Sequence, residues 1–553
     1  MTFDVMLDNG RIEAMRAAGL WSDQLLVDCL DDIAARDPAR VAVVDHNSMS
    51  ATSTTLSYGE LYQRSRRIAA GLVALGLAPG DVIGVQLPSW WHYAALHAAC
   101  VRIGVVINPL MPIFRERELE FMLGYAGTRV LIVPRHFRSF DYPAMVEQLR
   151  PRLPALEHVL IVGGTTPETS FEHRLLDHAH ETEVDCTALF AARRPAPNDV
   201  TEIMYTSGTT GQPKGVMHTA NTLLCKARLA RELFGFGADD AIFMGSPVAH
   251  QTGFMYGIVF ALYNHAKLVL QDQWEPSAAA RLIAAERCTL TLGATPFLAD
   301  LVQVAASGEH DLSSLRLFLC AGAPIPRVLV QQAARVLPNL YVMSAWGMTE
   351  MGISTATYPG DPPDKVFETD GRALPGHAVR VVDDRGQPVA ADGEGRLQAR
   401  AATLFVGYLK RPVEYGVDAD GWFETGDNAR MDADGYIRIT GRSKDIIIRG
   451  GENIPVVEIE ELLYRHPAVE DAAVVAMPDP RLGERACAFV SLKDGHTFDF
   501  TTMRAYFEAQ HMARQYLPER LEIIDAFPRT PSGKIQKFVL RERARGLTPT
   551  RGE

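Results

Sequence analysis

The segment YTSGTTGQPKGVMHT, Tyr205–Thr219, is the stretch that decides the fold class of this chain. Its core follows the strand-like run EIMY and precedes the helical run NTLLCKARLARELF. Glycines let backbone amides approach an anion and hydroxyl side chains add donors, which is typical of a phosphate-binding loop; a glycine-rich surface turn is the alternative. The nucleoside-triphosphatase loop requires glycine before its lysine and a hydroxyl after it. Because Pro213 precedes Lys214 and Gly215 follows it, the ligand must be held by another geometry.

Short β-branched runs alternate with alanine- and leucine-rich amphipathic segments along most of the chain. Runs such as VIGVQL at 82, VLIV at 130 and LTLG at 290 are typical of buried strands. Strand, helix and strand in succession predict parallel sheets covered by helices, so the larger unit should be α/β. After Gly376, short strands and tight turns such as DADG at 432 predict a small antiparallel β section.

A last unit begins near GRSKD at 441. It contains the strand-like runs IIIR, AAVVAM, ACAFVSL and LEII and the helical runs VEIEELLYRH and MRAYFEAQHMA. This pattern predicts a compact α+β module of about 100 residues, a typical domain size. We therefore expect an N-terminal domain over 1–441, a junction over 442–446 and a small C-terminal domain over 447–553.

Composition narrows the class of protein. The 553 residues are 47% apolar and 22% charged, as in globular enzymes with more than one unit. A net charge of −12 argues against a nucleic-acid binder. Seven cysteines without zinc spacing indicate reduced thiols. The N-terminus is not a secretory signal, and Arg102 interrupts the most apolar helical stretch, so we expect no transmembrane segment and a cytoplasmic location.

TSGTTGQPKG resembles the phosphate-loop signature of the adenylate-forming superfamily, which contains acyl-CoA synthetases, luciferases and peptide-synthetase adenylation domains. Further marks follow in family order, namely AGAPIP at 321, WGMTEMG at 346, WFETGD at 422, TGR at 440 and RTPSGKIQK at 529. Each alone also fits an ordinary turn, a buried tryptophan or a solvated cation, but six in order across about 330 residues are specific. Phrases such as ITGRSKDIIIRGGENI make the whole chain similar to bacterial short- and medium-chain acyl-CoA synthetases and to cyclohexanecarboxylate–CoA ligases.

The resemblance implies a site for ATP. In the family the loop holds the phosphates, the AGA backbone borders adenine, an aromatic ring stacks on adenine, and an aspartate and an arginine contact the ribose. The residues at these positions are Thr206, Ser207, Gly208, Thr209, Thr210, Gly211, Lys214, Ala321, Gly322, Ala323, Trp346, Gly347, Met348, Asp427 and Arg442. Trp346 replaces the more frequent tyrosine, and an indole ring can still stack. The same comparison places Thr349 at the α-phosphate and Glu350 at Mg²⁺.

The resemblance also implies a reaction in two steps. The carboxylate of an acid attacks the α-phosphate of ATP, and the thiol of coenzyme A then attacks the acyl-adenylate. Because the nucleophile is already ionised, positioning and charge stabilisation replace a general base. Lys534 matches the lysine that serves the first step, and Lys444 matches the hinge about which the C-terminal domain swings. Gly450 and Gly451 match the loop that would then face pantetheine.

The segment SPVAHQTGFMYG at 246 is expected to border the acid. His250 matches the histidine beside the carboxylate in the family, although a hydrogen-bonded core histidine is the alternative. No Asp or Glu occurs from Ala241 through Gln271, where amino-acid-activating relatives place an aspartate, so a plain carboxylic acid is favoured. We expect an apolar wall, with glycines leaving space, from Gly253, Phe254, Met255, Tyr256 and Gly257.

The implied cofactors are ATP, Mg²⁺ and coenzyme A, and the implied partner is a small carboxylic acid, either cyclohexanecarboxylate-like or a short- to medium-chain fatty acid. A lysine acetyltransferase and a deacetylase are further expected partners, because acetylation of Lys534 would erase its charge. Two alternatives stay open: a ligase that loads a carrier protein, and a catalytically silent nucleotide-binding regulator. The silent regulator is disfavoured because the expected site residues are all present, namely Lys214, Glu350, Asp427, Arg442 and Lys534.

Overall fold

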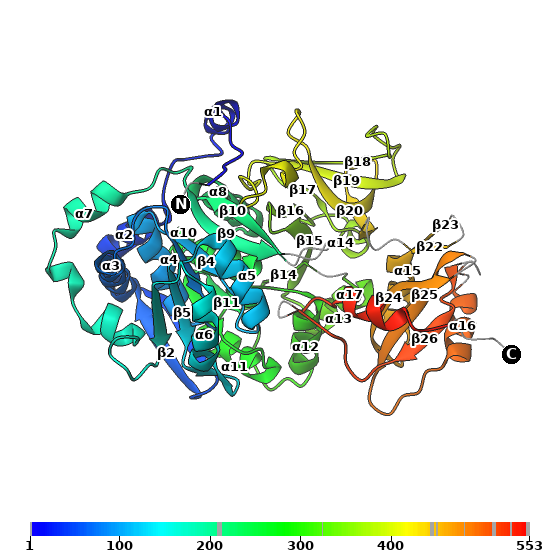
Figure 1. Ribbon diagram of the computed structural model, residues 1–553. Coiled ribbons are helices and arrows are strands. Elements are labelled where there is room, and N and C mark those ends of the chain that lie inside the picture. Colours follow the sequence, from blue (N-terminus) through cyan, green and yellow to red (C-terminus); the bar gives the residue numbers. More distant parts are fainter. Residues whose placement is uncertain are drawn as a thin grey trace.

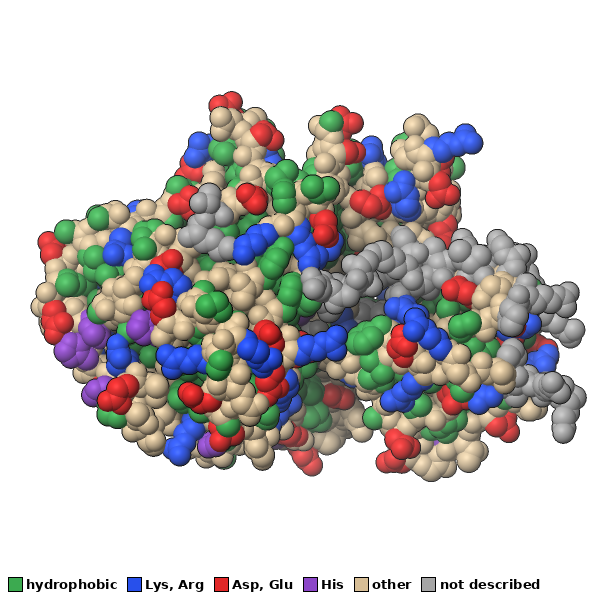
Figure 2. Space-filling view, viewed as in Figure 1, with side chains coloured by type: hydrophobic (Ala, Val, Ile, Leu, Met, Phe, Trp, Pro, Cys, Tyr) green, Lys and Arg blue, Asp and Glu red, His purple; other side chains and the backbone are tan. Residues whose placement is uncertain are grey.

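The computed structural model describes residues 3–206, 213–322, 325–442, 447–449, 452–479, 482–510, 512, 516–530 and 533–548. It confirms an α/β fold with a large N-terminal part and a smaller C-terminal part. Figure 1 shows the C-terminal part, coloured orange to red, beside the larger part, with a small yellow sheet above the junction. Acidic and basic side chains are interspersed over the described residues on the face drawn in Figure 2.

One large sheet of the N-terminal part carries the strands that end at the site. Its order is β17 (Arg372–Ala373), β16 (Gly352–Ala356), β15 (Tyr341–Met348), β14 (Leu317–Cys320), β13 (Leu290–Gly293), β11 (Ala241–Met244), β12 (Lys267–Gln271), β1 (Val41–Asn47) and β2 (Thr52–Ser57). The strands from β1 through β15 in this order pair in parallel, as the sequence predicts, and β16 then turns back on β15.

A second sheet presents the predicted phosphate loop at its edge. Its order is β10 (Lys214–Thr219), β9 (Val200–Thr206), β4 (Val106–Pro109), β3 (Val82–Val85), β5 (Val130–Pro134) and β8 (His158–Val162). Pairing is parallel except between β9 and β10. These strands are buried along nearly their whole length, which explains their continuous apolar runs.

Helices pack against both sheets and close the core. They are α2 (Leu26–Arg36), α3 (Tyr58–Ala74), α4 (His92–Ile103), α5 (Glu116–Ala126), α6 (Tyr142–Leu149), α8 (Ala220–Phe234), α10 (Phe260–Asn264), α11 (Pro276–Glu286), α12 (Thr295–Ala305) and α13 (Arg327–Val336), with α1 (Asn9–Ala17), α7 (Cys186–Arg193) and α14 (Pro363–Glu368) nearer the periphery. Every residue of α4 is buried, and Arg102 there pairs with Asp31, so the most apolar stretch is a core helix. Among the described residues, no helix combines the length and apolarity needed to cross a membrane.

The predicted β section is an antiparallel sheet. Its strands are β18 (His377–Val382), β19 (Glu394–Ala401), β20 (Phe423–Met431) and β21 (Ile437–Arg442). Phe405, Tyr408 and Phe423 belong to the small core beneath it, and Trp346 from the large sheet packs into the same core. The sheet therefore positions residues of two different segments against one another.

The C-terminal part has the predicted α+β pattern around its own core. It contains β22 (Ile447–Arg449), β23 (Glu452–Ile454), α15 (Val456–Arg465), β24 (Val469–Asp479), β25 (Gly483–Leu492), α16 (Phe500–Ala509), β26 (Arg520–Ile523) and α17 (Lys537–Ala544). Outside the described residues lie most of the expected junction, including Lys444, and the two loop glycines Gly450 and Gly451. Arg438 of β21 forms an ion pair with Glu461 of α15, which joins the β section to the C-terminal part.

Candidate active site

The phosphate loop is flanked by two antiparallel strands. Thr206 in β9 pairs with Lys214 in β10, and the Thr206 hydroxyl donates to the Lys214 carbonyl oxygen at 3.5 Å. The helix expected after the loop is present as α8, which begins at Ala220, but the sequence did not predict that Lys214–Thr219 is a strand. Lys214 is therefore fixed by a strand ladder. Outside the described residues lie Ser207, Gly208, Thr209, Thr210 and Gly211.

Lys214 and Glu350 belong to one polar cluster centred on Tyr408. The Lys214 ammonium forms an ion pair with Glu414 at 2.7 Å and lies 4.7 Å from the centre of the Tyr408 ring. The Tyr408 hydroxyl donates to Glu350 Oε1 at 2.7 Å, and Glu350 is 6% exposed. Carboxylate oxygens are the ligands that Mg²⁺ prefers. The structure thus brings together the residues expected at the outer phosphates and at the metal.

Trp346 and Asp427, expected at adenine and ribose, are hydrogen bonded to each other. Trp346 Nε1 donates to Asp427 Oδ2 at 2.8 Å, and both residues are buried. Asp427 lies within β20 rather than in a turn, and its backbone pairs with that of Arg442, whose side chain lies outside the described part. An indole carries an N–H donor on its ring. Trp346 therefore also orients the carboxylate, a role that the sequence did not show.

We expect Trp346→Phe to weaken nucleotide binding about tenfold, because it removes a hydrogen bond to a charged group and leaves Asp427 without its ring donor. Calorimetric titration with AMP measures this directly. Trp422→Phe is the matched control, since Trp422 instead stacks against Arg380 at 4.3 Å. Equal affinities for AMP in the two variants would contradict the role given to the Trp346 N–H.

Gly347 and Met348 end strand β15, and Thr349 begins the turn that leads to β16. A Cβ on Gly347 would lie 2.2 Å from the Gly352 carbonyl oxygen, so a side chain there would force the two strands apart. His218 Nε2 lies 2.9 Å from the Thr349 carbonyl oxygen and donates to it. The turn that bears Glu350 is therefore anchored by a buried imidazole.

Sequence reasoning missed the residues behind this turn. Glu202, His218 and Lys226 are all buried, in β9, β10 and α8. Burial raises the pKa of Glu202 to about 7 and lowers that of Lys226 to about 7, and the opposite charges of the two groups counteract both shifts. The signal in the sequence was a charged residue inside each of three apolar runs. Tyr408 gave no such signal, because only tertiary contact brings it to Glu350.

The lysine loop near the C-terminus is a compact turn. The Thr530 N–H donates to the Lys534 carbonyl oxygen at 2.7 Å, and the Lys534 N–H donates to Thr530 Oγ1 at 3.0 Å. Gly533 has φ +85°, which favours glycine. A Cβ built on Gly533 would lie 3.4 Å from Phe297 and 3.5 Å from Ala294. The turn is thus seated on the start of α12 in the N-terminal part.

This seating brings Lys534 to the predicted adenine segment. A Cβ built on Gly322 would lie 3.1 Å from Lys534 Cε and 3.6 Å from Nζ, so the absence of a side chain at Gly322 makes room for the lysine. Ala321 precedes this glycine and bonds through its N–H to the Gly293 carbonyl oxygen at 3.2 Å. Ala323 lies outside the described residues. Two expected site segments, the one after β14 and the lysine turn of the C-terminal part, therefore meet beside the start of α12.

His250 lies at the same place. Its Nδ1 accepts from the Thr252 N–H at 3.2 Å at the start of α9 (Gln251–Gly253). Burial, reinforced by the positive charge of Lys534, lowers the pKa of His250 to about 3, so the ring is neutral at physiological pH. Gly253 does not leave open space as expected, because a Cβ there would lie 2.4 Å from the Pro247 carbonyl oxygen. The glycine instead permits close backbone packing.

A cavity of about 290 Å³ opens beside His250, between the two parts of the chain. Its walls are mainly apolar, with Arg138 and Arg529 as cations. Lining residues from the N-terminal part include Ser89, Met111, Phe137, Pro247, Ala249 and Trp274. The cavity is large enough for an extended chain of small groups and is lined from both parts.

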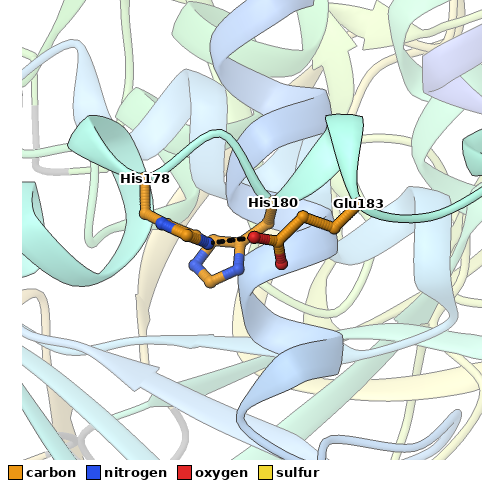
Figure 3. A group of neighbouring side chains, drawn as sticks. All are labelled: His178, His180 and Glu183. Atoms are coloured by element: carbon orange, nitrogen blue, oxygen red, sulfur yellow. Dashed lines mark ion pairs between the residues drawn. The ribbon is translucent and has the colours of Figure 1, made fainter.

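A group of possible metal ligands lies elsewhere on the surface. His178, His180 and Glu183 approach one another before α7, as Figure 3 shows. His178 Nε2 pairs with Glu183 at 2.7 Å, and His180 Nε2 lies 2.9 Å from the Arg174 carbonyl oxygen. Existing partners therefore account for this group. Mg²⁺ prefers an all-oxygen environment, which Glu350 supplies better than two imidazoles.

Comparison with known proteins agrees with this geometry. The family model described as AMP-binding enzyme matches residues 30–409, and the model of the AMP-binding enzyme C-terminal domain matches residues 458–534. The chain belongs to the AMP-binding enzyme family. It is accordingly an AMP-forming acid–CoA ligase, and the cofactors of this class are ATP, Mg²⁺ and coenzyme A.

Individual relatives cover nearly the whole chain. It is 36% identical over 545 residues to the medium-chain fatty-acid–CoA ligase of Escherichia coli strain K12, covering 98% of this chain and 94% of the relative. It is 34% identical over 537 residues to a salicylyl-CoA synthase / salicylate adenylyltransferase of a Streptomyces species, covering 96% of each. The crystal structure of the anthranilate CoA ligase AuaEII with anthranoyl-AMP superimposes with a TM-score of 0.84 at 25% identity, covering 95% of this chain and 98% of that one.

Proposed function

We propose that this ligase activates a small, mainly apolar carboxylic acid, alicyclic or of short to medium chain length, and transfers it to coenzyme A. The observation that supports this best is that Lys534, Gly322 and His250 lie close together, at the segment that is expected to border the acid. A cation delivered by the C-terminal part there meets both the acid and the nucleotide. This is what adenylation of a carboxylate requires.

In the first step two anions must approach each other, so catalysis depends on charge stabilisation. We propose that Lys534 lies between the carboxylate and the α-phosphate and that Lys214 binds the outer phosphates. Glu350 would hold Mg²⁺. Thr349 serves the α-phosphate, while Trp346 and Asp427 hold the nucleoside. Acetylation of Lys534 would remove the charge that this step needs, which makes that residue a candidate regulatory target.

In the second step the thiol must reach the adenylate carbonyl. We assign this route to the 290 Å³ cavity, because Ala249, the neighbour of His250 in sequence, lines it and its mainly apolar walls can be followed by a pantetheine arm. Arg529 and Thr530 of the lysine turn line the cavity in the present arrangement. We therefore propose that the C-terminal part swings about residues 442–446, with Lys444 as the hinge, and that Gly450 and Gly451 replace the lysine turn.

The class of acid is inferred from the residues around His250. The absence of Asp and Glu from Ala241 through Gln271 leaves no counter-ion for a substrate ammonium in this segment. Phe254, Met255 and Tyr256 are buried, which provides apolar surroundings. The names of the relatives add one aliphatic and two aromatic acids, all of moderate size. These observations favour an acid of similar bulk without a charged ammonium group; the aromatic amine of anthranilate is uncharged at neutral pH and needs no counter-ion.

The test is pyrophosphate release over a panel of acids, with coenzyme A present and absent. We expect turnover with short- to medium-chain acids or cyclohexanecarboxylate, and steady turnover only when coenzyme A is added. Turnover that requires a phosphopantetheinylated carrier protein instead would identify a carrier-loading ligase. Nucleotide binding without pyrophosphate release from any acid would indicate the silent regulator.

A further inference from the structure

The ammonium group of Lys226 is buried and incompletely paired. Lys226 is 3% exposed, and its recorded partner in the described part of the chain is the His218 ring, 3.0 Å away at Nε2 and 3.4 Å away at Nδ1. Nε2–H already donates to the Thr349 carbonyl oxygen, so only Nδ1 can accept. Thr222 Oγ1 also lies 3.2 Å from that nitrogen. An ammonium carries three donors, and most of them remain available.

These donors belong to a residue that lines a small cavity. The cavity has a volume of about 10 Å³, which is near the minimum for one water-sized group. Around Lys226, its wall is formed by Leu229, Leu233, Tyr256, Ile353 and Leu374, with His377 and Thr403 at the rim. The rim groups are already bonded to each other, because His377 Nε2 lies 2.8 Å from Thr403 Oγ1. Lys226 is therefore the lining residue with donors to spare, at a cavity whose walls are mainly apolar.

Two residues of the cavity wall lie on short segments that also carry residues of the expected site. Tyr256 lies six residues after His250, along α9 and the following helical turns, which spans about 9 Å at the helical rise. Ile353 lies three residues after Glu350, and its N–H donates to the Tyr256 hydroxyl at 2.8 Å. A Cβ on Gly352 would lie 2.7 Å from the Tyr256 hydroxyl oxygen and 3.2 Å from Lys226 Cδ. Both segments thus run from the carboxylate end of the site to Lys226.

We propose that this cavity is the buried end of the acyl pocket and that Lys226 binds an oxygen at the far end of the acid. The inference rests on the proposed function, which it narrows to acids with an apolar body and a distal hydroxyl, keto or carboxylate group. The body would span about the 9 Å between His250 and Tyr256. A terminal oxygen matches both the size of the cavity and the unused donors of Lys226.

A purely structural role for Lys226 explains less of the geometry. Lys226 attracts Glu202 and Glu350 electrostatically, but neither carboxylate lies within ion-pair distance of it among the described residues. A counter-ion alone has no reason to adjoin a cavity. Burying a cation without full hydrogen bonding is costly, and a ligand oxygen would offset that cost.

The experiment compares acids that differ only at the far end. Pyrophosphate release is measured for cyclohexanecarboxylate and its para-hydroxy and para-keto derivatives, and for octanoate, ω-hydroxyoctanoate and octanedioate. We expect kcat/KM to be about a hundredfold higher for an acid with the distal oxygen than for its apolar analogue, because an apolar end leaves the buried donors unpaired. The keto, hydroxyl and carboxylate arms show whether the preferred oxygen is neutral or anionic.

Lys226→Met tests the residue itself. It should reduce the preference ratio, which is kcat/KM for the oxygenated acid divided by kcat/KM for its apolar analogue, to near one. Methionine fills similar space without donors. Arg231→Met is the control, because it removes one exposed cation from the same helix and should keep the ratio. A thermal melt with and without AMP establishes whether Lys226→Met folds, and the wild-type ratio decides the proposal if it does not.

Each outcome bears on a different claim. Equal kcat/KM for apolar and oxygenated acids in the wild-type enzyme would overturn the inference, meaning that a resident water occupies the cavity. A ratio that survives Lys226→Met would also overturn it. Failure of every acid to release pyrophosphate would instead refute the proposed function, and the two failures are therefore distinguishable.

Discussion

Replacing Lys534 by alanine is expected to slow acyl-adenylate formation by about a hundredfold or more, as in other enzymes that lose one electrostatic donor. The reason is geometric. Lys534 reaches Gly322 and influences His250, so its charge lies where the acid and the α-phosphate must meet. Single-turnover pyrophosphate release measures this step alone. Thioester formation from supplied acyl-adenylate should be largely spared, because the lysine has left the site by then.

The control for this prediction is Lys493→Ala, which removes an exposed lysine from the same C-terminal part. It should leave both half-reactions unchanged. If Lys534→Ala slowed both half-reactions equally while its thermal melt matched wild type, the lysine would not be specific to adenylation. The role assigned to it would then be wrong.

Glu350→Gln is expected to lower adenylation by about a hundredfold or more, because the charge that we assign to Mg²⁺ binding is lost while the side chain keeps its size. The amide oxygen can still accept from the Tyr408 hydroxyl, so the buried contact at 2.7 Å survives. Part of the loss should be recovered at high Mg²⁺. A titration of initial rate against Mg²⁺ concentration separates weaker metal binding from a damaged fold.

Glu394→Gln is the matched control for this charge, since Glu394 is exposed on β19 and pairs with Arg430. We expect its Mg²⁺ dependence to be that of the wild-type enzyme. An unchanged Mg²⁺ dependence in Glu350→Gln would show that Mg²⁺ does not bind this carboxylate. Tyr408 would then position a residue with a purely structural role.

Much of the fold could be predicted because its signals are local. Buried strands such as β5 and β13 are continuous apolar runs, and the alternation of strand and helix determines parallel pairing. Strand β10 was not predicted, and this has a physical cause. Lys214 and Gly215 interrupt the apolar pattern at the start of the strand, and only pairing with β9 makes the segment extended.

The candidate site was predictable where a motif carries its own geometry. Lys534 at the tip of a glycine-containing turn and Glu350 between two strands are such cases. The bond between Trp346 and Asp427 was not predictable, because it joins residues 81 apart in sequence. Lys226 could be noticed as a charge within an apolar helix, but its relation to Tyr256 and Ile353 depends on tertiary packing.

The central claim is that one part of the chain presents Lys534 for the first half-reaction and must leave for the second. A reversible crosslink between Ala294→Cys and Gly533→Cys tests it. A Cβ on Gly533 would lie 3.5 Å from Ala294 Cβ, within the usual range for a disulfide. Because φ at Gly533 is +85°, a cysteine there strains the backbone, so the reduced double variant must first match the wild-type adenylation rate. The native cysteines are all buried, which limits competing crosslinks.

We measure both half-reactions on the oxidised protein, and again after reduction of the same sample. The account predicts that the oxidised form makes acyl-adenylate and pyrophosphate but little acyl-CoA, and that reduction restores acyl-CoA formation. Rapid acyl-CoA formation by the fully crosslinked protein would contradict the account, because the lysine turn could then remain seated throughout the reaction.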